Sequence, residues 1–148
     1  ERIVSLDLDA VIVGDLTPLF DRPDDFVIWG GQSVKPRAQT YNWYNGSLMM
    51  LRAGTRTQVW SKFDPARSPQ LAHNAGCRGS DQGWIAYCLG RNEATWGLRD
   101  GVCSYRIDVQ PAGGRLPPNA RIVAFHGQYD PWQPTMRTRH GWIREHYR

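Results

Sequence analysis

Lysine, cysteine and long apolar runs are all scarce in this chain of 148 residues. Among its 18 basic residues only Lys35 and Lys62 are lysines, so arginine supplies most of the positive charge behind the net charge of +4. Arginine binds phosphates and carboxylates through two parallel hydrogen bonds, so this bias suits a phosphorylated ligand. For any single arginine, a solvated basic surface is the simpler interpretation.

The three cysteines, Cys77, Cys88 and Cys103, are odd in number and form no CxxC pair. This pattern argues against a disulfide framework and a zinc site, and it favours a reducing compartment. No apolar stretch approaches the roughly 18 residues that a membrane span needs. We therefore expect a soluble cytoplasmic chain, with a peripheral position at a membrane surface left open.

Apolar residues make up 41% of the chain and charged residues 22%, which is typical of one globular domain over residues 1–148. Segments typical of strands alternate with segments typical of helices, which predicts an α/β or α+β fold. The last segment, 133–148, is a basic and aromatic tail. Because the charge is spread along the whole chain, we expect this tail to be a solvated terminus and not a nucleic-acid interface.

The expected strands are short apolar runs with period-two alternation, and the expected helices carry capping residues at their starts. In residues 3–9 the alternation places Asp7 and Asp9 on one face of a strand. The clearest helix follows Ser80 and ends at Gly90. The other expected strands cover 26–29, 44–53 and 121–125, with short strands within 95–109, and shorter helices begin near Thr55 and Ser68.

Three residues could together hold a hard divalent cation. Asp7 and Asp9 offer carboxylate oxygens, and His126, in a stretch that follows an apolar strand, can act as a neutral imidazole ligand. Two carboxylates and one imidazole suit manganese well and magnesium acceptably. Taken singly, the aspartates also fit a solvated strand end, and the histidine fits a structural hydrogen bond.

Two further stretches could contact a ligand. The helix start "SDQG" places Asp81 and Gln82 where both can hydrogen-bond hydroxyl groups, beside free backbone N–H groups. In "YNGS", Asn45 can both donate and accept hydrogen bonds, and Gly46 permits close approach of a ligand. A capped helix and an ordinary turn are the plain alternatives for these two stretches.

The order of these stretches resembles the second half of metal-dependent glycosyltransferases of the GT-A fold. The closest pattern is glycosyltransferase family eight, which includes glycogenin and the bacterial lipopolysaccharide galactosyltransferases. The resemblance runs from the first strand to about Trp132 and is carried by "LDLDAVIVGDLTPLF", "YNGSLMML", "SDQGWIAYCLG" and "FHGQYDPW". It implies a GT-A-like mixed sheet with flanking helices, without the N-terminal βαβ half that holds the nucleotide in that family.

The resemblance also implies roles for single residues. The family's manganese ligands correspond to Asp7, Asp9 and His126. The residues that correspond to the substrate-binding positions are Asn45, Gly46, Ser47, Asp81, Gln82, Gly127 and Trp132. Asp81 and Gln82 would then lie at the reacting face of the donor sugar.

The reaction implied is hexosyl transfer, retaining at the anomeric carbon, from a nucleotide-sugar donor of which a UDP-sugar is the first candidate. The acceptor, a glycan, a lipid or a protein, stays open, and so does self-association through an uncovered edge of the sheet. Two alternatives remain. One is a catalytically inactive remnant or fragment of such a transferase. The other is a phosphatase of the haloacid-dehalogenase type, with Asp7 as nucleophile and Asp9 as acid/base.

Overall fold

The structure is a computed structural model that describes residues 1–31, 43–77 and 80–147. Its contacts divide the chain into two compact units. Unit 1 consists of Glu1–Ser5 and Pro23–Thr95, and unit 2 consists of Leu6–Arg22 and Trp96–Arg148. We describe each unit by itself.

Unit 1 contains a four-stranded sheet with the order β1-β4-β3-β5. The strands are β1 (Arg2–Leu6), β3 (Phe26–Gly30), β4 (Tyr44–Arg52) and β5 (Ala94–Trp96). β3 and β4 pair in the antiparallel sense, and their register shifts between Ile28 and Trp29. These strands agree with the apolar runs predicted at 26–29 and 44–53.

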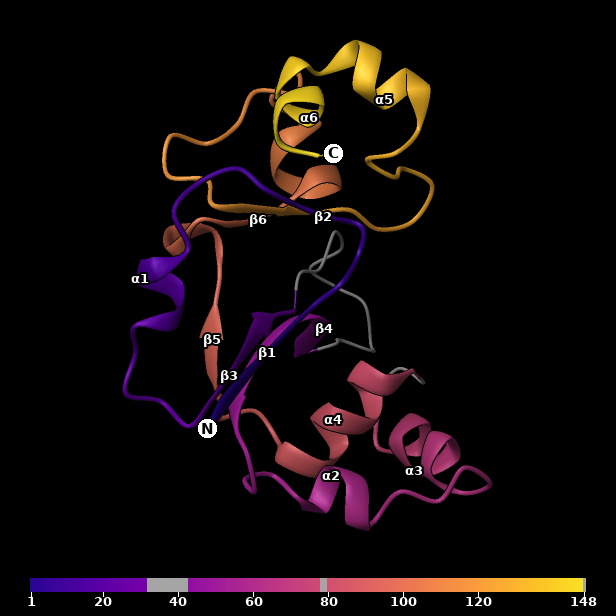
Figure 1. Cartoon of the computed structure of the whole chain (residues 1–148). Coiled ribbons are helices and arrows are strands. Elements are labelled where there is room, and N and C mark those ends of the chain that lie inside the picture. The colour runs from indigo at the N-terminus through magenta and orange to yellow at the C-terminus, as the bar shows by residue number, and fades with distance from the viewer. Residues whose placement is uncertain (32–42, 78–79, 148) are drawn as a thin grey trace. The chain divides into compact units, whose positions relative to one another are not determined.

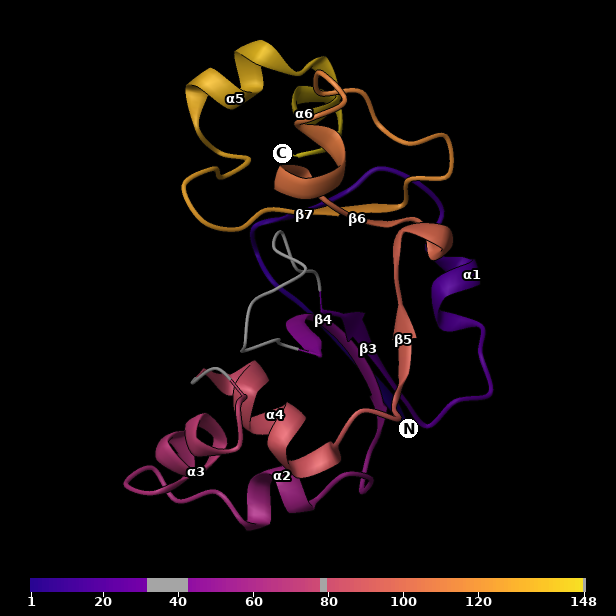
Figure 2. The same ribbon diagram turned by 180° about the vertical axis from the view of Figure 1, so that it is seen from behind.

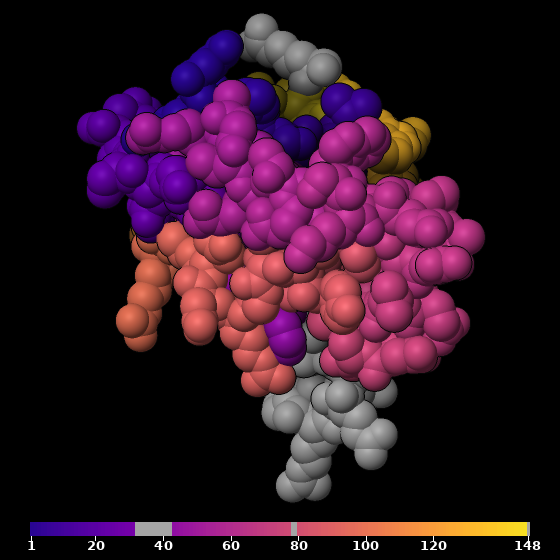
Figure 3. Space-filling view, turned by 90° about the horizontal axis from the view of Figure 1, so that it is seen from below, coloured from indigo at the N-terminus to yellow at the C-terminus, as the bar shows by residue number. Residues whose placement is uncertain are grey.

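The described residues of unit 1 also form three short helices: α2 (Gln58–Ser61), α3 (Ser68–Asn74) and α4 (Asp81–Leu89). The helix α4 confirms the element predicted after Ser80, and Gly90 ends it with a φ of 72°. The buried residues of unit 1 form a cluster from the sheet and helices, with Phe26, Ile28, Tyr44, Ala72, Cys77, Trp84, Ile85 and Ala86. In Figure 3 the magenta and salmon segments of this unit lie side by side at the surface.

Unit 2 contains a three-stranded sheet with the order β2-β7-β6. β2 (Ala10–Ile12) runs antiparallel to β7 (Ile122–Ala124), and β6 (Val102–Ser104) runs parallel to β7. The other elements are α1 (Thr17–Phe20), the 3-10 helix η1 (Leu98–Asp100), the π-helix η2 (Tyr105–Val109), α5 (Pro134–Arg139) and α6 (Gly141–His146). Figures 1 and 2 both show α5, α6 and η2 on the same side of the β6–β7 pair.

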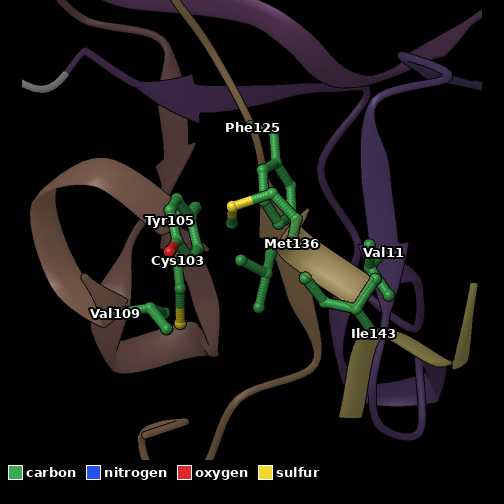
Figure 4. Packing of buried hydrophobic residues seen from close by; sticks show 8 residues of the cluster. Val11, Cys103, Tyr105, Val109, Phe125, Met136 and Ile143 are labelled. Carbon is green, nitrogen blue, oxygen red and sulfur yellow. The ribbon is translucent and has the colours of Figure 1, made fainter. Parts of the chain in front are cut away.

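The tail at 133–148 is part of the core of unit 2, which corrects the prediction of a solvated basic terminus. Met136 of α5 and Ile143 of α6 are buried against Val11, Cys103, Tyr105 and Phe125 (Figure 4). The rings of Tyr105 and Phe125 stack with their centroids 4.7 Å apart. The sequence pattern missed this packing because charged residues surround the few apolar positions that point inward.

The first strand is also shorter than predicted. β1 ends at Leu6, and residues 7–9 form a turn in which the Ala10 N–H donates to the Asp7 carbonyl over 3.2 Å. Asp7 and Asp9 therefore lie in a turn between two strands and do not share a strand face. β1 ends before them, and β2 begins directly after Asp9. In the part of the chain that the structure describes, no helix is long and apolar enough to span a membrane.

Two neighbouring glycines in unit 2 provide a test of its packing. Gly113 and Gly114 both have a positive φ, at 71° and 85°. A Cβ on Gly114 would clash with Cε1 of the buried His140, whereas a Cβ on Gly113 would meet no atom of the described residues within 4 Å. The His140 ring is held by a hydrogen bond of 2.8 Å between its Nε2 and the Tyr105 hydroxyl.

We expect Gly114→Ala to lower the free energy of unfolding by about 2 kcal/mol more than Gly113→Ala, because only the former crowds His140. Both variants share the strain of alanine at a positive φ. The difference between their free energies of unfolding therefore reports the clash with His140. Urea denaturation, monitored by tryptophan fluorescence, measures the free energy of unfolding of both variants. Equal losses of stability in the two variants would contradict this packing.

Candidate functional site

The candidate residues fall into two groups, one in each unit. Asn45, Gly46, Ser47, Asp81 and Gln82 lie in unit 1. Unit 2 holds the metal-site candidates and two residues of the stretch "FHGQYDPW" (125–132), which we call the late motif. These residues are Asp7, Asp9, His126, Gly127 and Trp132. The structure describes all ten of these residues.

In unit 1 the strand β4 and the start of α4 meet at Gly46. The Gly46 N–H donates to Gln82 Oε1 over 3.4 Å. A Cβ on Gly46 would lie 3.1 Å from Asp81 Oδ2, so the carboxylate of Asp81 rests against the bare backbone of the strand. The structure thus brings together two stretches that are 36 residues apart, as their predicted shared role requires.

Asn45 and Ser47 flank this contact on β4. Asn45 Oδ1 accepts a hydrogen bond of 2.9 Å from the Ser47 N–H. Within the described ranges, the amide nitrogen of Asn45 has no hydrogen-bond partner, so it stays available to a ligand oxygen. Asp81 is exposed and Gln82 is half-buried. The group therefore presents a carboxylate, two amides and backbone N–H groups, which are the partners that sugar hydroxyls need.

In unit 2 the pairing of β2 with β7 places Asp9. The register is Ala10 opposite Ala124, and the Phe125 N–H donates to the Asp9 carbonyl over 3.0 Å. Asp9 therefore precedes β2 at the same end of the sheet where His126 follows β7. The predicted proximity of the aspartate stretch and the histidine stretch along this sheet edge is present in the backbone.

The carboxylate of Asp9 lies in an unfavourable environment. Its Oδ1 atom is buried and, among the residues that the structure describes, has no hydrogen-bond partner. Burial raises the pKa of Asp9 above its ordinary value of 3.8, and the negative charges of Asp7 and, less strongly, Asp130 raise it further. A cation beside this carboxylate would relieve both effects.

His126 is half-buried and already has a partner. Its Nε2 atom forms a hydrogen bond of 2.7 Å with the Ser104 hydroxyl at the end of β6. Burial lowers the pKa of His126, and the positive charge of Arg106 lowers it further, while Asp108 partly opposes them. The imidazole is therefore neutral near pH 7, the form that can ligate a metal, and Nδ1 is the ring nitrogen not engaged with Ser104.

The fit of these residues to a divalent cation is partial. The buried oxygen of Asp9 without a partner and the nearby charge of Asp7 match the oxygen donors that manganese and magnesium accept. Over residues 1–31, 43–77 and 80–147, however, no three side chains of His, Cys, Asp and Glu come close enough to hold an ion. Ligation by His126 stays a prediction.

The late motif around Gly127 is a loop anchored to the core of unit 2. Gly127 has a φ of 86°, a conformation that favours glycine. The Tyr129 hydroxyl accepts a hydrogen bond of 3.1 Å from Gln110, and its ring meets Tyr105 edge-on. Trp132 is 51% exposed. The loop thus has a fixed base, with an exposed glycine and an exposed indole along it.

Sequence reasoning missed three residues near His126, namely Ser104, Arg106 and Asp108. Asp108 Oδ2 accepts a hydrogen bond of 2.7 Å from the Ser104 N–H, and the Ser104 hydroxyl accepts one of 3.2 Å from Ile107. Ser104 is the last residue of β6, the strand that runs parallel to β7, and Arg106 and Asp108 follow it in η2. A sequence signal for them exists, because polar residues directly after an apolar strand gather at the sheet's carboxyl edge, but the local pattern over 95–109 predicts short strands only.

Comparisons with known proteins place this fold. No protein-family model matches the sequence, and no curated protein gives a significant match. Among solved structures, the galactosyltransferase LgtC, crystallised with donor and acceptor sugar analogues, matches with a TM-score of 0.61 and 12% identity. The match covers 99% of this chain and 62% of LgtC.

A second similar structure is the glycosyltransferase GlyE of Streptococcus pneumoniae TIGR4. It matches with a TM-score of 0.57 and 16% identity, over 97% of this chain and 39% of GlyE. The chain thus spans less than two thirds of either protein. The predicted resemblance to these glycosyltransferases is confirmed at the level of the fold, as a mixed α/β structure that corresponds to part of a GT-A-like domain.

The environment of Asp9 predicts a stability effect. We expect Asp9→Asn to raise the free energy of unfolding at pH 7 without metal, by an amount on the order of 1 kcal/mol, because it removes a buried charge. The folded-state pKa of Asp9 lies above its unfolded value. The destabilisation by the ionised group is therefore complete above the folded pKa and absent below about 3.8, where both states are protonated.

Urea titrations of wild type and Asp9→Asn from pH 7 down to pH 3.5 measure this difference. It should shrink as the pH falls through the folded pKa of Asp9. A variant less stable than wild type at pH 7 in the presence of a chelator would show that the carboxylate has a stabilising partner.

Proposed function

We propose that this chain is the metal- and donor-binding part of a glycosyltransferase that takes a hexosyl group from a nucleotide sugar. The observation that carries the proposal is the buried oxygen of Asp9, which has no hydrogen-bond partner in the described part of the chain and lies at the sheet edge where His126 emerges. A fold shared with part of LgtC and GlyE supports this proposal.

In unit 2, Asp7 and Asp9 would hold a divalent cation, manganese or magnesium, with His126 as a third ligand through Nδ1. When bound, such an ion supplies positive charge to the diphosphate of the donor and so makes it a better leaving group. Burial keeps the His126 imidazole neutral, and the Ser104 hydroxyl fixes its ring. A ring held in this way needs little reorganisation when a ligand arrives.

In transfer, the bond between the anomeric carbon and the diphosphate oxygen breaks, and the electron pair leaves with the diphosphate. A new bond forms between the anomeric carbon and the acceptor's hydroxyl oxygen, whose proton is released. Stabilisation of the negative charge on the departing diphosphate is the main task of a protein in such a reaction. We propose transfer with retention, and a UDP-sugar as the first donor to examine.

In unit 1, the group at Gly46 would bind the hydroxyls of the donor sugar. Asp81 accepts hydrogen bonds, the free amide nitrogen of Asn45 donates them, and Gln82 can do both. Because a side chain at position 46 would press on the Asp81 carboxylate, the glycine keeps that carboxylate free to turn toward a ligand. Asp81 and Gln82 would face the reacting carbon. Gly127 and Trp132 are proposed as substrate-binding residues of unit 2.

Manganese and UDP together test this proposal. We expect the two to raise the melting temperature of the chain on the order of 5 °C at saturating concentrations, and more than the sum of their separate effects. Asp9→Ala should abolish the joint shift, since it removes a ligand of the ion. Differential scanning calorimetry measures each combination.

Glu145→Gln provides the matched control, because it removes one negative charge from an exposed helix position of unit 2, where Glu145 Oε1 lies 3.9 Å from His146 Nε2. It should leave the joint shift unchanged. A folded wild type with no shift would instead support the inactive remnant. Hydrolysis of p-nitrophenyl phosphate that disappears in Asp7→Asn would support the phosphatase alternative.

A further inference from the structure

Arg106 and His126 lie just beyond the same end of the sheet of unit 2. β6 and β7 run parallel, with Ser104 opposite Ala124. Arg106 lies two residues after Ser104, in η2, and His126 lies two residues after Ala124. The two side chains therefore emerge from neighbouring parallel strands at the carboxyl edge, where ligands bind in sheets of this kind.

The guanidinium of Arg106 points to the exposed backbone at Gly127. Its Nη1 atom lies 3.7 Å from the place where a Cβ of Gly127 would stand, and no other heavy atom is found within 4 Å of that place. Gly127 has the positive φ of 86° and no side chain to cover the approach. The positively charged guanidinium of Arg106 and the exposed backbone of Gly127 thus face the same space.

Arg106 also differs from arginines that have a structural role. In unit 1, Arg56 donates to both Asp25 and Glu93, with distances of 2.7 to 3.2 Å. Arg106 is exposed and makes no hydrogen bond or ion pair with any residue of the described segments. Nearby polar groups are already paired with one another, such as Ser104 with His126 and with Asp108. The N–H donors of Arg106 are therefore available.

We propose that Arg106 binds the diphosphate of the donor, beside the ion held by Asp7 and Asp9; this assignment rests on the glycosyltransferase function proposed above. A divalent cation compensates only part of the charge of the diphosphate once its bond to the sugar breaks and a further negative charge develops on the departing oxygen. The planar guanidinium can donate two parallel hydrogen bonds to phosphate oxygens, which a point charge cannot do. Arg106 is then the residue of this chain that binds the leaving group directly.

Isothermal calorimetry with manganese and inorganic pyrophosphate tests this role, because pyrophosphate carries no base or sugar that other residues could bind. We expect Arg106→Gln to weaken the affinity for manganese pyrophosphate about tenfold or more. Arg106→Lys should fall between Arg106→Gln and wild type, because it keeps the charge but loses the fork. The affinity for manganese alone should change far less.

Arg99→Gln is the matched control. Arg99 is an exposed arginine of η1, which precedes β6, so it lies at the opposite end of that strand. It should bind manganese pyrophosphate as wild type does. The melting temperature of Arg106→Gln without ligand should equal that of wild type, since the side chain has no partner among the described residues to lose.

The outcomes separate this inference from the function on which it rests. If wild type and Arg106→Gln bind equally and Asp9→Asn does not bind, the role of Arg106 is wrong and the metal site stands. If Arg99→Gln weakens binding as much as Arg106→Gln, only general charge matters and the role is also wrong. If folded wild type does not bind manganese pyrophosphate, both the role of Arg106 and the proposed function fail.

Discussion

The antiparallel pairing of β2 with β7 is the constraint on which the candidate metal site depends. It joins residues more than a hundred positions apart, with Ala10 opposite Ala124 and the Phe125 N–H donating to the Asp9 carbonyl. A slip of this register by one residue would turn Val11 out of the core and move Asp9 away from the edge where His126 emerges. Burial of Val11 and Val123 against Phe125 and Ile143 opposes such a slip.

The same core packing that fixes the register also makes ionisation of the Asp9 carboxylate unfavourable. Packing around β2 removes one carboxylate oxygen from water and provides no donor in the described residues to replace the lost hydrogen bonds. Structural carboxylates are normally paired, as Asp25 and Glu93 are with Arg56. A buried carboxylate oxygen without a partner among the described residues, at the sheet edge where His126 follows β7, is more typical of a functional site than of a structural ion pair.

Local sequence patterns predicted the elements with strong local signals and missed those decided by distant contacts. β3, β4 and α4 were recognisable because apolar periodicity and the Ser80 and Gly90 boundaries specify them locally. The π-helix at Tyr105–Val109 and the burial of Met136 and Ile143 depend on tertiary packing, which periodicity over a few residues does not encode. In the site, the resemblance to glycosyltransferases implied a shared role for Gly46 and Asp81, whereas Arg106 was missed because its only signal is its place after the short apolar strand β6.

The most direct test of the central claim, a divalent ion at the edge formed by Asp9 and His126, is paramagnetic broadening in NMR spectra of the ¹⁵N-labelled chain titrated with manganese. We expect the amide signals of residues 7–10 and 125–127 to broaden at substoichiometric manganese, before those of any other segment, because relaxation falls steeply with distance from the ion. Early broadening centred on another part of the chain, or uniform broadening that follows exposure to solvent, would contradict the account.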